Sequence, residues 1–200
     1  RSACPLVVAP QRTEAASELC RRYGPDVIFS DDGLQHYGLA RDFEIVVVDV
    51  RRRFGNGLCL PAGPLREPLS RLRSVDLVVG NGGVVPPGST AFRLVAGDFV
   101  ALADGTRRSP VSRRGRTCVA IAGIGHPERF FVTLRELGLT IEPCPFPDHY
   151  RYTAADFAPF AGKPLLMTEK DAVKCRALGL QDAWYLEVEA QLDPVLRGAL

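Results

Sequence analysis

The sequence lacks the features that mark several classes of protein. No apolar run reaches the ~18 residues of a membrane-spanning helix, and the chain does not open with a signal-peptide pattern. The net charge of +2 is too small to indicate a nucleic-acid-binding protein. The six cysteines include no C-x-x-C pair, which argues against a zinc site or a disulfide framework, so we expect reduced core thiols in a cytosolic protein.

Two phosphate-binding signatures are also absent. No G-x-x-x-x-G-K-[ST] motif occurs in the sequence, so no segment of it is expected to cradle a triphosphate by itself. Gly123-Ile124-Gly125 follows an apolar run, but Glu128 stands where the dinucleotide-binding fingerprint requires its third glycine. This short loop is therefore only a weak indication of an anion-binding helix start.

What is present is an ordinary globular composition. The 200 residues are 46% hydrophobic and 24% charged, which suits one large or two small domains. The 25 basic residues are lopsided, since three are lysines and the other 22 are arginines. Arginine suits phosphate and carboxylate recognition through its planar fork, but a GC-rich genome produces the same bias. We therefore give weight only to arginines that lie inside motifs.

Apolar runs rich in valine and isoleucine predict strands that are covered on both faces. These runs are residues 6–9, 26–30, 43–49, 75–80, 118–122, 165–168 and 184–188. Helices are expected over residues 13–23, with Thr13 as the N-cap, from Pro127 to Leu137, and briefly after the strand at 165–168. Because strands alternate with helical crossovers, the pattern predicts a doubly wound α/β sheet.

Residues 84–116 differ from the rest of the chain. Pro86-Pro87-Gly88 breaks the pattern, and two short strand candidates, 92–95 and 99–102, precede the turn signal Asp104-Gly105. We interpret residues 89–116 as a β-hairpin linker. It would join a domain at residues 1–88 to a second α/β domain at residues 117–200.

The most informative stretch is residues 27–37, in which an apolar strand pattern runs into the adjacent carboxylates Asp31 and Asp32. Ligands bind outside the carboxyl ends of the strands in open α/β sheets. A carboxylate at that position can hold Mg²⁺ against the phosphates of a nucleotide. An Asp-Asp-Gly turn that only closes a buried strand explains the same residues equally well.

Arg66 and Glu67 lie in a long segment, residues 51–68, that is rich in glycine and proline. Loops of this length inside compact domains are usually functional or disordered, and the leucines in this one argue against disorder. The two charged residues could hold a phosphate or a sugar group. An exposed ion pair is the structural alternative.

Two motifs in the C-terminal half also allow two interpretations each. His149 follows Asp148 in a proline-rich loop, which suits a positioned acid–base pair, although a lone loop histidine is more often simply solvated. Lys170 and Asp171 follow a strand and could contact a nucleotide. Alternatively, Thr168 or Asp171 caps a helix and the charges face water.

Taken together and in order, these motifs resemble the tetraacyldisaccharide 4'-kinase family of lipid A biosynthesis. The matching blocks are residues 26–37, 44–68, 75–83, 122–131, 146–149 and 165–176. Six ordered blocks are far more specific than any one of them. The resemblance implies an α/β fold with a P-loop NTPase-like parallel sheet, truncated at the N-terminus, and a smaller C-terminal α/β domain joined by the hairpin linker.

The resemblance also implies an activity. Members of the family transfer the γ-phosphate of ATP to the 4'-hydroxyl of an acylated glucosamine disaccharide 1-phosphate, which forms lipid IVA. The implied co-substrate is ATP, the implied cofactor is Mg²⁺, and no nucleic acid is involved. The implied location is the cytoplasmic face of the inner membrane of a Gram-negative bacterium.

Roles for individual residues follow from the same resemblance. Asp31 and Asp32 match the acidic pair at the Mg²⁺–ATP site, with Asp32 as the favoured metal contact and Asp31 as a metal or catalytic residue. His149 matches the histidine that assists the catalytic base. The positions that match the surroundings of the sugar-phosphate substrate or the metal are Gln35, His36, Arg66 and Glu67, and those near the nucleotide are Lys170 and Asp171.

The family has parts that this sequence does not contain. They are an N-terminal segment that contacts the membrane surface, the glycine-rich phosphate loop, and an aspartate that pairs with the histidine. We therefore expect a fragment that is inactive alone and exposes a sheet edge and an apolar face. The alternative function is that of a non-catalytic α/β protein that binds a phosphorylated glycan or lipid.

Overall fold

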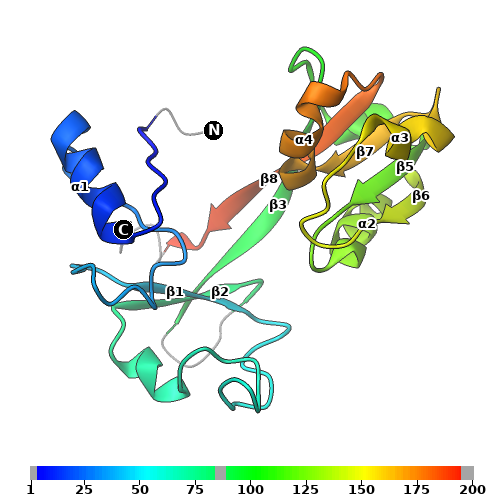
Figure 1. Ribbon diagram of the computed structural model, residues 1–200. Coiled ribbons are helices and arrows are strands. Elements are labelled where there is room, and N and C mark those ends of the chain that lie inside the picture. The colour runs from blue at the N-terminus through cyan, green and yellow to red at the C-terminus, as the bar shows by residue number, and fades with distance from the viewer. Residues whose placement is uncertain (1–3, 84–88, 195–200) are drawn as a thin grey trace. The chain divides into compact units, whose positions relative to one another are not determined.

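The computed structural model describes residues 4–83 and 89–194, in two compact units that span Arg1–Ala91 and Phe92–Leu200 (Figure 1). Each unit combines helices with parallel strands, so the predicted α/β class is confirmed. The division at residues 88 and 116 stays a prediction. The expected break at Pro86-Pro87-Gly88 lies outside the described residues.

The first unit contains α1 (Arg12–Tyr23), the short 3₁₀ helix η1 (Leu69–Arg73) and two parallel strands, β1 (Ile45–Asp49) and β2 (Leu77–Asn81). Both strands overlap the apolar runs from which we predicted them, so these two predictions are confirmed. The prediction of Thr13 as the N-cap of α1 was wrong. Gln11 precedes the helix without a side-chain cap, and Thr13 lies inside the first turn.

Two predicted strands of the first unit were wrong. Residues 6–9 and 26–30 pair with no strand among the described residues, and an apolar run forms a strand only where a partner takes up its backbone hydrogen bonds. Their side chains stand in solvent, with Leu6 86% and Phe29 90% exposed. The expected exposed apolar surface is therefore present.

The second unit is built on a mixed sheet with the order β3-β8-β7-β5-β6. Neighbouring strands are parallel from β8 through β7 and β5 to β6. Strand β3 pairs antiparallel with β8 and with β4. The strands are β3 (Thr90–Ala101), β4 (Arg107–Arg108), β5 (Thr117–Ala122), β6 (Thr140–Pro145), β7 (Leu165–Thr168) and β8 (Ala183–Leu192). The helices are α2 (Pro127–Glu136), α3 (Ala154–Phe157), α4 (Glu169–Cys175) and the 3₁₀ helices η2 (Pro110–Arg113), η3 (Ala158–Phe160) and η4 (Arg176–Leu178).

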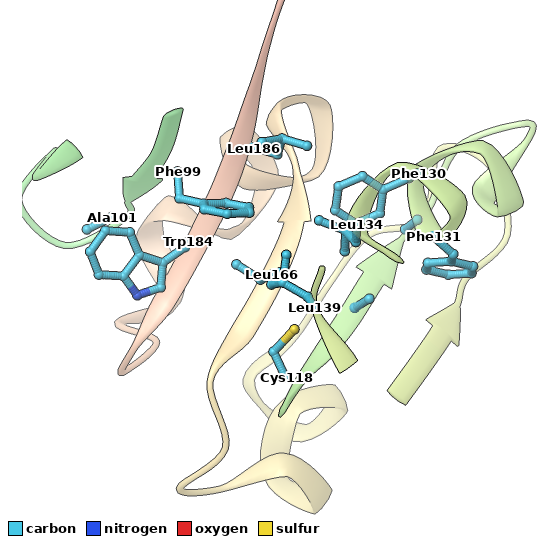
Figure 2. Packing of buried hydrophobic residues seen from close by; sticks show 12 residues of the cluster. Phe99, Ala101, Cys118, Phe130, Phe131, Leu134, Leu139, Leu166, Trp184 and Leu186 are labelled. Atoms are coloured by element: carbon cyan, nitrogen blue, oxygen red, sulfur yellow. The ribbon is translucent and has the colours of Figure 1, made fainter. Parts of the chain in front are cut away.

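Both faces of this sheet are covered, because alternate side chains of a strand point to opposite faces. Cys118 and Ala120 of β5 pack with Phe130 and Leu134 of α2, in the cluster drawn in Figure 2. The intervening residues of β5 pack on the other face with Tyr152 and with residues of α3 and α4. This two-sided burial confirms the prediction for the second unit. The prediction was wrong for β1, in which Ile45 and Val47 are exposed.

The region of the predicted hairpin differs in detail from the prediction. Instead of two short strands, β3 runs unbroken to Ala101 and pairs with β8 with a register shift between Ala96 and Phe99. Strand β6 was not predicted, because Pro143 and Pro145 argue against a strand. Because β6 is the last strand in the sheet order, it has a neighbouring strand on one side only. Prolines, which have no backbone N–H to donate, are tolerated in such an edge strand.

The six cysteines differ in burial, and Cys59 and Cys144 are only partly buried. Cys118 and Cys175 are buried, as expected for core thiols, and burial raises the pKa of Cys118 to about 11 and that of Cys175 to about 12. Cys4 and Cys20 are exposed, so the core expectation was wrong for them. Of the helices in residues 4–83 and 89–194, none combines the length and apolarity that a bilayer crossing requires.

Candidate functional site

The Asp-Asp-Gly sequence forms a tight turn in the first unit. Asp32 adopts a left-handed backbone conformation with φ 48°, and the N–H of His36 donates to the carbonyl of Gly33 at 3.0 Å. Glycine suits position 33, because a Cβ there would lie 2.8 Å from Oγ of Ser30, which would have to move. The turn is therefore present, but the buried strand that it was expected to close is not, and the turn is compatible with a binding role for the exposed carboxylates.

Asp32 is joined to a residue more than thirty positions away in the sequence. Nη1 of Arg66 donates to both carboxylate oxygens of Asp32, at 3.1 and 3.0 Å, and to Oε1 of Gln35 at 3.4 Å. The side chains of Arg66 and Asp32 are 61% and 68% exposed. An anionic ligand can therefore reach the guanidinium, and a cation can reach the carboxylate.

Glu67 points into the same cluster but is more enclosed. Its carboxylate accepts hydrogen bonds from the hydroxyl of Tyr37 at 2.5 Å and from Nε2 of Gln35 at 2.6 Å, and Nε of Arg71 lies 3.3 Å away. These donors, Tyr37 first, lower the pKa of Glu67 below its ordinary value. Arg66 and Glu67 are thus not an ion pair with each other. Each instead contacts residues 31–37, which we call the acidic loop.

Two other predicted residues of this loop have exposed positions beside the cluster. Asp31 directly precedes Asp32, and its carbonyl accepts a hydrogen bond from Nη2 of Arg12 at 3.2 Å. His36 is exposed, and its carbonyl accepts the N–H of Leu39. The structure therefore brings Asp32, Gln35, Arg66 and Glu67 together in one hydrogen-bonded group and leaves Asp31 and His36 on its rim.

The remaining predicted residues belong to the second unit, His149 in the loop that follows β6 and Lys170 and Asp171 in the first turn of α4. Nζ of Lys170 donates to Oδ1 of Asp148 at 3.2 Å, and Nε2 of His149 lies 3.8 Å from Oδ2 of Asp148. His149 is 79% exposed and has a left-handed backbone with φ 60°. Lys170 and, second, His149 lower the pKa of Asp148, so this carboxylate stays ionised beside the imidazole.

Asp171 has a different environment, because it is completely buried. Its carboxylate accepts hydrogen bonds from the N–H of Gly123 at 3.0 Å, the hydroxyl of Thr168 at 2.6 Å and Nζ of Lys174 at 3.2 Å. Thr168 is the N-cap of α4, as one of the two interpretations predicted, but the expectation in that interpretation that the charges face water was wrong for Asp171. These contacts favour a role for Asp171 in fixing the loop at Gly123 over direct contact with a nucleotide.

Sequence reasoning missed two features of these sites. Asp32 and His149 are two of four non-glycine residues with positive φ in the described parts of the chain, and such backbone strain clusters at functional sites. Glu44, Arg41 and Arg71 form ion pairs directly behind the first cluster. No motif singles out these three residues in a chain with so many arginines.

The carboxylates of Asp31 and Asp32 are the candidate ligands for Mg²⁺. Within residues 4–83 and 89–194, no three His, Cys, Asp or Glu side chains form a group that could hold a metal ion. Mg²⁺ is usually bound by one or two carboxylates together with phosphate oxygens of a substrate, rather than in a cage of protein ligands. The exposed, adjacent carboxylates of Asp31 and Asp32 fit that mode of binding.

Comparisons with known proteins agree with the order of the motifs. The family model described as tetraacyldisaccharide-1-P 4'-kinase matches residues 1–200. The chain is 53% identical over 193 residues to a tetraacyldisaccharide 4'-kinase from Nitrosococcus oceani, which covers 96% of this chain and 56% of the relative. It is 50% identical over 194 residues to one from Hahella chejuensis, covering 96% and 57%.

A solved structure is similar as well. The crystal structure of the "apo" form of LpxK from Aquifex aeolicus in complex with ATP matches with a TM-score of 0.73 and 27% identity, over 93% of this chain and 59% of that chain. The chain thus spans little more than half the length of each of these relatives.

Proposed function

Because the chain belongs to the tetraacyldisaccharide-1-P 4'-kinase family, we propose that it forms part of an enzyme that transfers the γ-phosphoryl group of ATP to the 4'-hydroxyl of a tetraacyldisaccharide 1-phosphate. The product would be lipid IVA, an intermediate of lipid A biosynthesis. The observation that carries this proposal is the convergence of Asp32, Gln35, Arg66 and Glu67. These residues come from two separate matching blocks and form one hydrogen-bonded cluster.

Phosphoryl transfer depends mainly on positioning and charge stabilisation, and the cluster suits both. Arg66 presents an exposed guanidinium, which binds a phosphate or a sugar oxygen of the disaccharide. Asp32, with Asp31 beside it, supplies the carboxylate oxygens for Mg²⁺. When bound, Mg²⁺ neutralises charge on the phosphates of ATP. The ATP in the related crystal structure supports the choice of nucleotide.

His149 suits the removal of the proton from the attacking hydroxyl. Its imidazole is exposed, and the ionised Asp148 beside it stabilises the protonated ring after the proton has moved. Lys170 holds Asp148 in place through their ion pair. Lys170 and Asp171 are assigned to the nucleotide side of the site, Asp171 through the loop that it fixes.

The acceptor is a lipid, so the proposed place of action is the cytoplasmic face of the inner membrane of a Gram-negative bacterium. Gln35 and His36 are assigned to the sugar part of the acceptor, because both lie on the exposed tip of the acidic loop. Glu67 supports Gln35 through its hydrogen bond.

The test uses the complete reading frame that contains this chain, purified in detergent. Incubation with γ-labelled ATP, Mg²⁺ and the tetraacyldisaccharide 1-phosphate should give a labelled bisphosphate, and dephosphorylation should release the label from the 4' position. Binding of the disaccharide without any transfer would instead support the non-catalytic alternative. Transfer to a different position or acceptor would refute the proposed substrate.

A further inference from the structure

Glu44 lies at the centre of an ion-pair network behind the acidic loop. Both of its carboxylate oxygens accept hydrogen bonds from Nη2 of Arg71 at 2.7 Å, and Nε of Arg41 lies 2.9 Å from Oε1. The side chain of Glu44 is 11% exposed and both arginines are 19% exposed, so these pairs are shielded from solvent. The backbone of Glu44 bonds Asp76 and Leu77 at the start of β2, which fixes the network to the sheet.

Arg41 connects this network to the turn that carries Asp32. Its Nη1 donates to the carbonyls of Gly33 and Leu34, both at 2.9 Å, immediately after Asp32 in the sequence. Its guanidinium also lies over the ring of Tyr37, 5.4 Å from the centroid. The acidic loop is therefore held from behind by a cation that Glu44 orients.

Arg71 connects the same carboxylate to the residue next to Arg66. Nε of Arg71 contacts Glu67 at 3.3 Å, and its Nη1 donates to Oγ of Ser74 at 2.7 Å, which fixes the guanidinium within η1. Glu67 in turn accepts from Gln35, whose Oε1 accepts from Arg66. A continuous series of polar contacts thus runs from the sheet to Arg66.

The exposed pair between Asp32 and Arg66 needs such support. Solvent-exposed ion pairs contribute only about 0–1 kcal/mol, too little to hold two long side chains in one geometry. The contact of Arg71 with Glu44, in which Nη2 donates to both carboxylate oxygens, is shielded and charge-assisted and is of the stronger kind. A fixed geometry of the exposed pair therefore requires the network behind it.

We propose that Arg71, oriented by Glu44, is a positioning residue of the phosphoryl-transfer site and acts through Glu67 and Gln35 on Arg66 and Asp32. This inference rests on the proposed function and deepens it. Arg71 does not touch substrate in this account. It determines where Glu67 lies, and so where the two exposed charged groups lie.

The first experiment replaces Arg71 by lysine in the complete reading frame. Lysine keeps the charge, but its single Nζ cannot contact Glu44, Glu67 and Ser74 at once, as the three guanidinium nitrogens of Arg71 do. We expect kcat per folded enzyme to fall at least about tenfold, because small displacements of positioned groups have effects of this size. The KM for ATP should stay within a factor of about two, since the substitution removes no proposed ATP contact.

Arg107→Lys is the matched control. Like Arg71, Arg107 contacts both carboxylate oxygens of a shielded glutamate, here Glu187, but it belongs to the second unit and to neither group of predicted site residues. It should leave kcat unchanged. A merely structural role for Arg71 predicts that both variants lower the amount of folded protein and neither lowers kcat per folded molecule.

A double-mutant cycle tests whether Arg71 acts through Glu67. If it does, Arg71→Lys should cause no further loss of kcat in a Glu67→Gln background, because coupled residues are not additive. Additive losses, or an unchanged kcat in Arg71→Lys alone, would overturn the proposal.

A second readout separates this inference from the proposed function. If the wild-type reading frame transfers no phosphate, the proposed function fails, and amide hydrogen exchange decides whether Glu44 orders the loop. In Glu44→Gln, the amides of His36 and Leu39 should exchange about tenfold or more faster, given the loss of charged hydrogen bonds. They should not change in Glu187→Gln. Unchanged exchange in Glu44→Gln would refute the positioning role.

Discussion

Replacing Asp171 by alanine should lower the free energy of unfolding of the second unit more than any surface substitution does. The carboxylate is completely buried and accepts from the N–H of Gly123, the hydroxyl of Thr168 and Nζ of Lys174. Alanine leaves the amide and the hydroxyl without this acceptor. Each unsatisfied buried polar group costs about 1–3 kcal/mol, so for these two groups we expect a loss of about 2–6 kcal/mol in the free energy of unfolding.

Urea unfolding followed by fluorescence measures this loss directly. Trp184 is the only tryptophan of the chain, and it is buried in the core of the second unit, so its emission reports on that unit. Glu128→Ala is the control, because Glu128 is 69% exposed in its pair with Arg135. It should cost less than about 0.5 kcal/mol.

A negligible loss of stability in Asp171→Ala would refute this prediction. If Asp171→Ala unfolds within about 0.5 kcal/mol of the wild type, the buried contacts do not hold the loop at Gly123. Asp171 would then be free to serve the nucleotide directly. A loss of kinase activity without a loss of stability would support that second assignment.

Two further outcomes are expected for the second unit. Gly123→Ala should lower the free energy of unfolding by about 1–3 kcal/mol, because the added Cβ would lie 2.5 Å from the hydroxyl of Tyr152. Gly125→Ala is the control, since its nearest contact is at 3.5 Å and the substitution should be tolerated. Equal urea midpoints for the two variants would contradict this prediction. The backbone N–H of Thr153 and then its hydroxyl hold the pKa of Asp156 below 3.8. The stability that wild type gains over Asp156→Asn should therefore be full above about pH 5 and shrink as the pH falls through the lowered pKa, and a gap that widens on acidification would contradict it.

Much of the fold could be predicted because the apolar runs are long enough to decide between structures. Strands β5 and β7 lie where their runs of apolar residues indicated, and Pro127 starts α2. In both strands, alternate residues reach two separate clusters, which is the two-sided burial that the runs indicated. Local sequence was sufficient where packing and propensity agree.

The failures also have physical causes. Residues 26–30 have the composition of a strand but no described strand beside them, and strand structure depends on a partner that composition does not reveal. Strand β6 was missed because prolines argue against strands except at sheet edges, and edge position is a property of the whole sheet.

The candidate site was predictable only in part. Asp32 and Arg66 belong to motifs, but their direct contact is a tertiary fact that neither motif contains. Arg41 and Arg71 could not be distinguished from the other arginines, since only the fold places them on Glu44. The burial of Asp171 was equally hidden, because an acidic residue after a strand is exposed in most proteins.

The proposed function gives both Asp32 and His149 a role in phosphoryl transfer. The most direct measurement is kcat for 4'-phosphorylation by the complete enzyme carrying Asp32→Ala or His149→Ala, with Glu128→Ala as the control. The account predicts that each site variant loses about 10²-fold or more while the control keeps its rate. Near-normal turnover in both site variants would contradict it.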